Sequence, residues 1–551
     1  MADPVFGIDL GTTYSAIAYI NDYGQAEVIR NSEGQETTPS VVYFESDTSY
    51  VVGREAKNTA LAYPDDTVSL IKRQMGNRVE MEHFGKAHSP ETISALILTD
   101  LVRTAQEATG IQSNRVVITV PAYFGLTERG ATRQAGEIAG LEVVGVVTEP
   151  VAAALSAGIK GDAEKTLFVY DLGGGTFDCT VMRVSPAGVE VIVTDGNRLL
   201  GGADWDVALF DLIVEKFQAR ANLTEDPAED SDFVQKLSND VEQCKITLTK
   251  KQKATVPCRY AGATEIIEVT REEFEERTRP LVERTLDIVR RAKEDAERRH
   301  PGISFDEVLL VGGSARMPMI SQSLTDTFGW ELTKTDFDLA VAKGAAIYGQ
   351  GASGFADRDI TGGEGGSGDD GDRRTAVGEG DGAATVDPDA PKQLLIGGRT
   401  MSISGVLSRG LGILFVRDNP TTGAMEEYVE FLAHKDDPVP LDIEVHAGTY
   451  SANQTEAQVA IYEQAGDVES EDKANSRELP PGCEFTGLPP LPKNSPIDIT
   501  VHIDAEGLST ITAYEPTSGR RLTATAQLSV LSEAEQAAAK EMVSGLVRRD
   551  D

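Results

Sequence analysis

The chain has 551 residues, of which 40% are hydrophobic and 25% charged, so it holds enough apolar sequence for several packed domains. Its formal net charge of −38 argues against a general binder of nucleic acid or of anionic membranes, because both need a basic face. Four cysteines without a paired metal spacing, no apolar leader and no apolar run of about 20 residues predict a reducing, cytoplasmic setting, without nucleic acid or membrane partners.

Residues 1–352 alternate short apolar strands with helical patterns, which predicts an α/β domain. An apolar strand comes first and ends at the turn Asp9-Leu10-Gly11-Thr12-Thr13-Tyr14. The elements expected next, in chain order, are a turn and strand over 37–44, a short helix over 70–74, a helix over 90–109, a strand over 116–124 that a proline ends, a helix over 127–139, a strand over 143–147 and an alanine-rich helix from 151.

A glycine-rich hairpin follows at Asp171-Leu172-Gly173-Gly174-Gly175-Thr176-Phe177-Asp178, between an apolar strand over 167–170 and a returning strand over 179–182. Consecutive glycines let backbone N–H groups approach an anion without a Cβ in the way. With a carboxylate at each end, the hairpin suits a phosphate held together with a metal ion. The alternative is an ordinary tight hairpin.

Residues 5–18 repeat the sequence pattern of this hairpin: an apolar strand, Asp-Leu-Gly, small hydroxyl residues and a second apolar strand. A third glycine turn follows the strand over 308–311. Repetition at distant places indicates two similar half-domains whose loops grip one polyphosphate from opposite sides. Before the third turn, Phe274, Leu281 and Ile288 recur every seven residues in a charged segment, which predicts an amphipathic surface helix.

Beyond residue 352 the composition changes twice. Residues 353–391 hold ten glycines, ten acidic and three basic residues. Such a segment cannot bury enough apolar area to fold, so we expect a flexible linker over 353–393 rather than an acidic binding tail. Residues 394–530 alternate apolar and polar residues between turns, which predicts an all-β domain with strands over 429–433, 442–446, 458–462, 497–503 and 509–513.

One helix is expected from Ser532 to Val547, where Ser532 and Glu535 are spaced as a capping box.

Taken together, these motifs resemble those of the 70-kDa heat-shock chaperone family. The resemblance rests on Ile8 to Tyr14, Val120 to Phe124, the 171–178 hairpin and Val311 to Pro318, and it covers nearly the whole chain outside 353–391. It implies a two-lobed α/β actin-like ATPase domain over 1–352, the linker over 353–393, an all-β sandwich peptide-binding domain over 394–530 and a short helical tail over 531–551, a truncated form of the family's lid.

The resemblance further implies ATP/ADP, Mg²⁺ and K⁺ as cofactors, in the cleft of the first domain. The residues implied at the phosphates are Gly11, Thr12, Thr13, Tyr14, Gly173, Gly174, Gly175, Gly201 and Gly202. Those implied around the adenosine are Glu242, Lys245, Gly313, Ser314, Arg316 and Asp338. Asp9, Asp171 and Asp178 would organise the metal ions and water, with Glu149 in the outer shell; Lys72 would touch the γ-phosphate, and Asp171 and Thr176 would position the attacking water.

Elementary chemistry agrees with these roles. Phosphoryl transfer needs positioning and charge neutralisation, and carboxylates hold Mg²⁺ through its waters. Lys72 supplies a point charge and Arg316 a plane that can stack on adenine. Two alternatives stay open: Lys72 as a surface lysine, and Glu149 as a helix N-terminal carboxylate favoured by the dipole.

In this family the β domain binds a short extended apolar peptide, so the implied partners are unfolded proteins, a J-domain co-chaperone and a nucleotide exchange factor. The peptide pocket is expected at Ile413, Phe415, Val416, Tyr450, Ala457 and Val459, with Tyr450 arching over the peptide backbone. The alternative is that these are core residues of a β-sandwich, which fits Ile413 and Val459 better than Tyr450.

The chain departs from the family pattern in its long linker, its single terminal helix, a tail without the helper-binding tetrapeptide, and Gly196-Asn197-Arg198 in place of the usual Asp-Thr-His. The first two predict weaker coupling between the sites and faster peptide release.

The favoured function is an ATP-dependent chaperone whose peptide affinity is set by ATP binding and hydrolysis. The alternative is a regulatory or exchange-factor-like relative with little turnover. A small-molecule kinase is disfavoured because the β domain would have no role.

Overall fold

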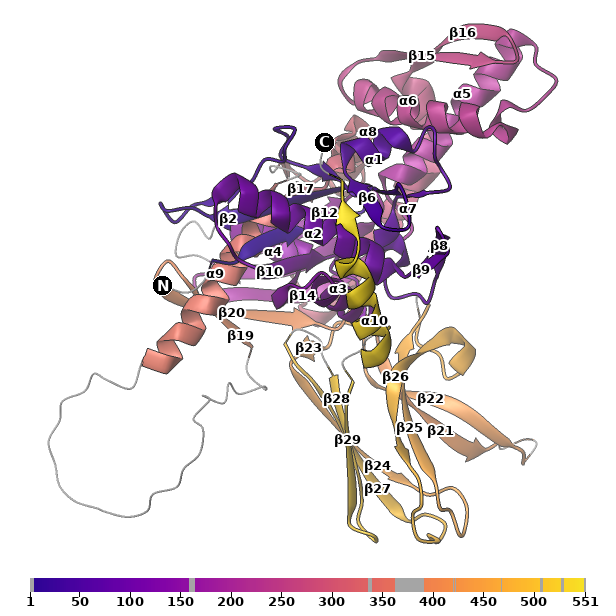
Figure 1. Ribbon diagram of the computed structural model, residues 1–551. Helices are drawn as coiled ribbons and strands as arrows, with labels where there is room; N and C mark the ends of the chain where they lie inside the picture. Colours follow the sequence, from indigo (N-terminus) through magenta and orange to yellow (C-terminus); the bar gives the residue numbers. More distant parts are fainter. Residues whose placement is uncertain are drawn as a thin grey trace, which may run out of the picture.

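The structure, a computed structural model, describes residues 4–157, 164–334, 339–361, 391–419, 421, 423–466, 468–505, 509–526 and 530–549. In Figure 1 an α/β region, coloured indigo to salmon, lies above an all-β region, coloured orange to yellow. The last helix, in yellow, lies beside the α/β region.

Lobe I, the first half of the α/β region, is built on a sheet with the order β11-β10-β1-β2-β3. Its strands are β11 (Glu142–Thr148), β10 (Arg115–Val120), β1 (Phe6–Asp9), β2 (Tyr14–Ile20) and β3 (Ala26–Val28). β1 runs antiparallel to β2 and parallel to β10. The helices that pack against this sheet are α2 (Pro90–Thr109), α3 (Leu126–Ile138), α4 (Glu149–Ala157) and α9 (Ala340–Thr361).

Lobe II repeats this arrangement on a sheet with the order β18-β17-β12-β13-β14-β20-β19. β12 (Lys165–Leu172) runs antiparallel to β13 (Phe177–Ser185) and parallel to β17 (Glu307–Val311), as β1 does to β2 and β10. The other elements are β14 (Gly188–Asn197), α5 (Gly202–Ala221), η2 (Pro227–Glu229), α6 (Ser231–Lys250), β15 (Lys253–Tyr260), β16 (Ala263–Thr270), α7 (Arg271–Arg299), η3 (Gly313–Arg316), α8 (Pro318–Phe328) and β18 (Leu332–Lys334). The predicted pair of similar half-domains is confirmed.

A smaller part of lobe I inserts between β3 and α2. It contains β4 (Thr38–Pro39), β5 (Val42–Phe44), β6 (Ser49–Val52), α1 (Arg54–Thr59), β7 (Thr67–Val68), η1 (Ile71–Gln74), β8 (Met81–His83) and β9 (Lys86–His88). The expected helix over 90–109 has those bounds in the structure, because Ser89 caps it and Gly110 ends it in a left-handed conformation. In α7, Phe274 and Ile288 are buried and Leu281 is partly buried, as its amphipathic pattern predicts.

The β domain consists of two four-stranded antiparallel sheets. One has the order β22 (Met425–Ala433), β21 (Leu411–Asp418), β25 (Ala457–Gln464) and β26 (Ser476–Phe485). The other has the order β24 (Leu441–Gly448), β27 (Pro496–Ile503), β28 (Ser509–Glu515) and β29 (Arg520–Ala526). Their apolar faces share one buried cluster, which is the packing of a β-sandwich. Two short elements, β23 (Pro438–Val439) and η4 (Lys473–Asn475), complete it.

The structure differs from the expected domain bounds on both sides of the linker. α9 continues to Thr361, so the expected boundary at residue 352 falls inside a helix. β19 (Lys392–Ile396) and β20 (Arg399–Val406), which we expected mostly in the β domain, extend the sheet of lobe II through pairing of β20 with β14. Leu394, Met401 and Ile403 bury their side chains there, and β20 covers an edge strand that would otherwise expose its backbone. Residues 362–390 of the expected linker lie outside the described residues.

The C-terminal helix, α10 (Glu533–Ser544), has the predicted capping box of Ser532 and Glu535 but ends before Val547. Residues 547–548 form a strand, β30 (Val547–Arg548), that pairs with β6. Val543 and Leu546 join the apolar core of lobe I, so the segment expected as a truncated lid is packed against the α/β region.

Candidate functional site

Two glycine-containing hairpins meet between the lobes. The first joins β1 to β2 and the second joins β12 to β13. A Cβ on Gly174 would lie 2.1 Å from Thr13 Oγ1, and one on Gly175 would lie 2.2 Å from Thr12 Cγ2. Only glycine permits this approach, so the two loops lie in contact across the cleft, as the sequence repeat indicated.

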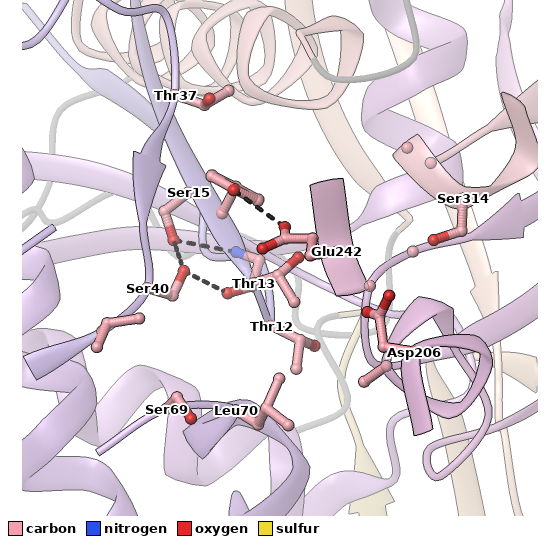
Figure 2. A pocket seen from close by; sticks show the side chains of 18 of the residues that line it. Thr12, Thr13, Ser15, Thr37, Ser40, Ser69, Leu70, Asp206, Glu242 and Ser314 are labelled. Carbon is pink, nitrogen blue, oxygen red and sulfur yellow. Dashed lines mark hydrogen bonds between the residues drawn. The ribbon is translucent and has the colours of Figure 1, made fainter. Parts of the chain in front are cut away.

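A cavity of about 800 Å³ opens beside these hairpins, a volume typical of pockets for small molecules and cofactors. Figure 2 shows Glu242 beside Thr13 near the centre of the view, with Asp206 and Ser314 to the right of Thr12 and Thr13. The predicted residues that line it are Asp9, Gly11, Thr12, Thr13, Tyr14, Lys72, Glu149, Asp171, Gly173, Gly174, Thr176, Glu242, Lys245, Gly313, Ser314 and Arg316.

Four other predicted residues, Gly175, Gly201, Gly202 and Asp178, lie beside this lining and support it. A Cβ on Gly201 would lie 2.5 Å from the carbonyl carbon of Gly175, and one on Gly202 would lie 2.2 Å from Ser314 Oγ. Asp338 lies outside the described residues.

A group of carboxylates lies at one end of the cavity. Single oxygens of Glu149, Asp171 and Asp178 lie within 4.8 Å of one another, and all three residues are buried. Both oxygens of Asp178 are buried, and a hydrogen bond from the Ala122 backbone only partly offsets that burial. Burial, followed by repulsion from the neighbouring carboxylates, raises the pKa of both Asp171 and Asp178 well above the ordinary value. Such a cluster suits a hard cation, which removes the repulsion.

This cluster differs slightly from the predicted metal set. Glu149, expected in the outer shell, belongs to it, and Asp9, expected within it, lines the same cavity close enough to raise the pKa of Asp171. Thr119 Oγ1 donates to Asp9 Oδ1 at 3.3 Å and helps to orient it.

Lys72 lies at the same end of the cavity, in η1. Its side chain is 4% exposed, and Nζ lies 2.6 Å from Glu149 Oε1. Glu149 is also the first residue of α4, where the helix dipole favours a carboxylate. The alternative of Lys72 as a surface lysine is therefore wrong. The position of Glu149 at the start of α4 agrees with its alternative interpretation, and its role at a metal ion stays a prediction. The next residue, Arg73, donates to the carbonyl of Gly175 at 2.8 Å and pairs with Asp204, so this turn also supports the second hairpin.

The far end of the cavity is lined by two charge pairs, one between the lobes and one within lobe II. Lys57 of α1 pairs with Glu242 of α6, and the Tyr14 hydroxyl donates to Glu242 Oε1 at 3.1 Å. Burial would raise the pKa of Glu242, but Lys57 lowers it below the ordinary value. Lys245 Nζ lies 2.6 Å from Asp206 Oδ2 and donates to the Gly202 carbonyl at 2.9 Å.

The predicted peptide-binding residues divide into two groups in the β domain. Ile413 and Val459 are each 3% exposed and belong to its central core, as the alternative interpretation held. Val416 is 37% exposed, while Phe415 and Ala457 are partly buried. Tyr450 follows β24 on a loop, where its hydroxyl donates to Asp418 Oδ1 and Lys493 Nζ lies 5.2 Å from its ring centre.

Comparison with known proteins decides the family. The model of the Hsp70 protein family matches residues 5–84 and 77–361. The chaperone protein DnaK of Halobacterium salinarum is 34% identical over 527 residues, which cover 94% of this chain and 74% of that protein. The chain belongs to the Hsp70 family. DnaK of Thermosipho melanesiensis is 34% identical over 532 residues and that of Thermotoga maritima 33% over 529, each covering 94% of this chain and 79% of the relative.

Membership of the Hsp70 family confirms the expected fold class, an actin-like ATPase domain followed by a β-sandwich. The protein is an ATP-dependent chaperone and an ATPase that uses ATP and ADP with Mg²⁺, and none of these relatives favours the regulatory alternative. Among the described residues, no helix is long and apolar enough to cross a membrane.

Sequence reasoning missed several residues of this Hsp70 cleft. Lys57 and Asp206 line the cavity, and Arg73 donates a hydrogen bond to the Gly175 carbonyl of the second hairpin. Asp206 could have been found from its place four residues after Gly202. Lys57 carries no local signal, because only the fold brings its helix opposite Glu242.

Proposed function

We propose that the cavity between the lobes is the ATP site and that its residues have the roles that the sequence implied. Gly11 to Tyr14 and Gly173 to Thr176 bind the phosphates through backbone N–H and hydroxyl groups. Glu242, Lys245, Ser314 and Arg316 surround the adenosine. The single observation that carries this proposal is the buried group of Lys72, Glu149, Asp171 and Asp178 at the end of the cavity beside both hairpins.

Hydrolysis then depends mostly on position and charge. Asp171 and Thr176 orient the attacking water toward the γ-phosphate, and Lys72 shares its charge between Glu149 and the γ-phosphate oxygens. Asp9, Asp171 and Asp178, with Glu149, would hold Mg²⁺ and K⁺, largely through water. Glu149, Asp171 and Asp178 are buried together, and among the described residues Lys72 is the cationic side chain beside them. A bound cation would offset the remaining negative charge of this cluster. Mg²⁺ bound there neutralises charge that develops on the phosphates.

The β domain is proposed to bind extended apolar segments of unfolded proteins beside Val416 and Tyr450, with nucleotide state controlling the affinity. Direct contacts between the domains support such coupling. Glu463 Oε1 of β25 accepts from the Leu126 N–H at the start of α3 at 2.8 Å, and Ser408 Oγ donates to the Phe124 carbonyl at 3.0 Å. Asp436 Oδ1 accepts from the Thr194 N–H of β14 at 2.9 Å. A movement of α3 would therefore displace β25, a strand of the proposed peptide-binding sheet.

We also propose the partners and the cellular setting of the protein. A J-domain co-chaperone and a nucleotide exchange factor are the partners that the family resemblance implies. A reducing cytoplasm suits Cys179, Cys244 and Cys258, which are buried free thiols.

The test is single-turnover hydrolysis of ATP by the full chain, with and without a saturating extended apolar peptide. Acceleration by the peptide supports both sites and their coupling. Hydrolysis that the peptide does not change contradicts the coupling, and ATP binding without turnover contradicts the catalytic roles.

A further inference from the structure

Residues 530–549 form a segment, here called the C-terminal strap, that runs from the β domain back to lobe I. It contains α10 and β30 and follows β29, the last strand of the β domain. In Figure 1 the yellow α10 lies beside α3, and the strand that follows it reaches β6.

The strap is fastened along its whole length. Val530, Ala539, Val543 and Leu546 are buried in the apolar core of lobe I. Before the helix, the Gln134 side chain donates to the Leu531 carbonyl at 2.8 Å and accepts from its N–H at 3.3 Å. Apolar burial and satisfied backbone groups together hold the strap in one place.

The end of the strap adds a strand to the sheet of β5, β6 and β7. The Val547 N–H donates to the Thr48 carbonyl at 2.8 Å, and the Arg549 N–H donates to the Tyr50 carbonyl at 3.0 Å. Between them, Arg548 Nε lies 2.7 Å from Asp100 Oδ1, whose side chain is only 5% exposed. A buried carboxylate of this kind needs a charged partner, so Arg548 locks the register of β30.

Arg549 extends these contacts to the helix beside the cleft. Its guanidinium pairs with Glu45, with Nη1 2.6 Å from Oε1, and with Glu55 of α1. Two residues further along α1, Lys57 pairs across the cleft with Glu242. The strap follows the β domain in the chain, and a path of contacts leads from the strap through α1 to the far end of the nucleotide cavity.

We propose that the C-terminal strap ties the position of the β domain to closure of the nucleotide cleft, with Arg549 as the positioning residue that holds α1 and its Lys57–Glu242 pair. The inference rests on the proposed assignment of the cavity as the ATP site. When the ion pair between Arg549 and Glu55 breaks, α1 no longer positions Lys57 against Glu242, and bound nucleotide dissociates faster. The buried groups around Lys72 keep their positions.

Release of a fluorescent ADP analogue from the full chain, chased with excess ATP, tests this proposal. Arg549→Glu is expected to release the analogue about two- to fivefold faster, the effect of losing one partly exposed ion-pair network. The single-turnover rate of ATP hydrolysis should stay within about twofold, because Arg549 acts on retention and not on the chemical step. Lys540→Glu, the same charge reversal at an exposed position of α10, is the matched control and should release at the parent rate.

Exchanging the charges of Arg549 and Glu55 tests whether the effect on nucleotide release depends on the contact between the strap and α1. Arg549→Glu combined with Glu55→Arg should restore slow release, because the ion pair is rebuilt with reversed polarity. Parent-like release by the single variant overturns the proposal, and so does fast release that the swap leaves unrestored. If the parent chain does not bind the analogue at all, the ATP-site assignment fails instead.

A second variant tests the strap through its backbone. Val547→Pro removes the N–H that donates to Thr48 and leaves every charge in place. Faster hydrogen exchange of β6 together with faster ADP release supports the strap, whereas loosening of β6 with parent-like release overturns it.

Discussion

Lys72 shows how far a single residue depends on its surroundings. A lysine in a short turn has no special chemistry, but here it is buried against Glu149 at the end of a cavity that Asp171 also lines. The low exposure means that its charge is poorly screened by water and acts strongly on whatever occupies the cavity.

Lys72→Ala is expected to lower the single-turnover rate of ATP hydrolysis by at least about a hundredfold, the effect of removing one preorganised charge from the transition state. ATP affinity should change little, because both hairpins and the adenosine end remain. Quenched-flow hydrolysis and equilibrium binding measure the two quantities. Lys540→Ala, at an exposed lysine, is the control, and normal hydrolysis by the Lys72 variant would refute the assigned role.

Glu463 is a second residue whose environment changes its chemistry. It is 1% exposed, and burial, with the nearby Glu128 as the next cause, raises its pKa to about 7 from an ordinary 4.5. The guanidinium groups of Arg409 and Arg477 oppose this rise, and Glu128 Oε1 accepts from Arg198 and Arg477, each at 3.4 Å. Because Glu463 reaches α3 from the β domain, contact between the domains is linked to its proton.

Contact between the domains should therefore weaken as pH rises. The pKa of Glu463 is higher in contact than apart, so contact takes up a proton and its stability is lost as pH rises through about 7. Between about pH 5 and 7 the equilibrium constant should fall by up to about tenfold per pH unit. Small-angle X-ray scattering of the full chain against pH measures the separation. Glu463→Gln keeps an acceptor for Leu126 and should flatten the profile; an unchanged profile would contradict the linkage.

At the scale of elements, β21 and the loop after β24 form the exposed part of the proposed peptide site. The Tyr450 hydroxyl donates a hydrogen bond to Asp418 at the end of β21, which links the loop to that strand. Val416 is the most exposed of the predicted pocket residues on β21, in contrast to the buried Ile413.

Val416→Phe is expected to weaken binding of an extended apolar peptide by about tenfold, because the larger ring takes the space of a peptide side chain. Fluorescence anisotropy of a labelled peptide gives the affinity. Met425→Phe, at a residue 64% exposed on the neighbouring β22, is the matched control and should bind normally. Unchanged affinity of the Val416 variant would place the peptide elsewhere on the domain.

At the scale of the whole molecule, the charge excess sets how the protein responds to salt. The chain has 89 acidic and 51 basic residues, which gives the net charge of −38. Many basic side chains are already engaged in surface ion pairs, such as Lys253–Glu268 and Arg277–Glu215, whose individual contribution is small. Repulsion among the remaining carboxylates opposes the compact state.

The free energy of unfolding should therefore rise between about 0.02 and 0.5 M NaCl, as the Debye length falls from about 20 Å to a few ångströms. Urea unfolding at each salt concentration, followed by circular dichroism, measures it. A matched series in an uncharged osmolyte separates screening from general solvent effects. A free energy that falls with salt would mean that the ion pairs outweigh the repulsion.

Local pattern determined much of this protein. Gly173 to Gly175 and their counterpart at Gly11 predicted the two facing hairpins, and Gly174 and Gly175 leave no room for a Cβ beside the threonine side chains of the other loop. Alternation of apolar residues predicted the strands of the β domain, and the Ser532–Glu535 spacing predicted the start of α10. These signals are local in sequence, so they survive without knowledge of the fold.

Tertiary structure decided what local pattern leaves open. Leu394 and Ile403 are apolar in either domain, and only the free edge of β14 assigns them to lobe II. Lys57 meets Glu242, and Arg549 meets Glu55, across separations in sequence that no periodicity spans. A charge has the same appearance in the sequence whether it faces solvent or a buried partner, so the closing pair and the strap became visible only when the chain was folded.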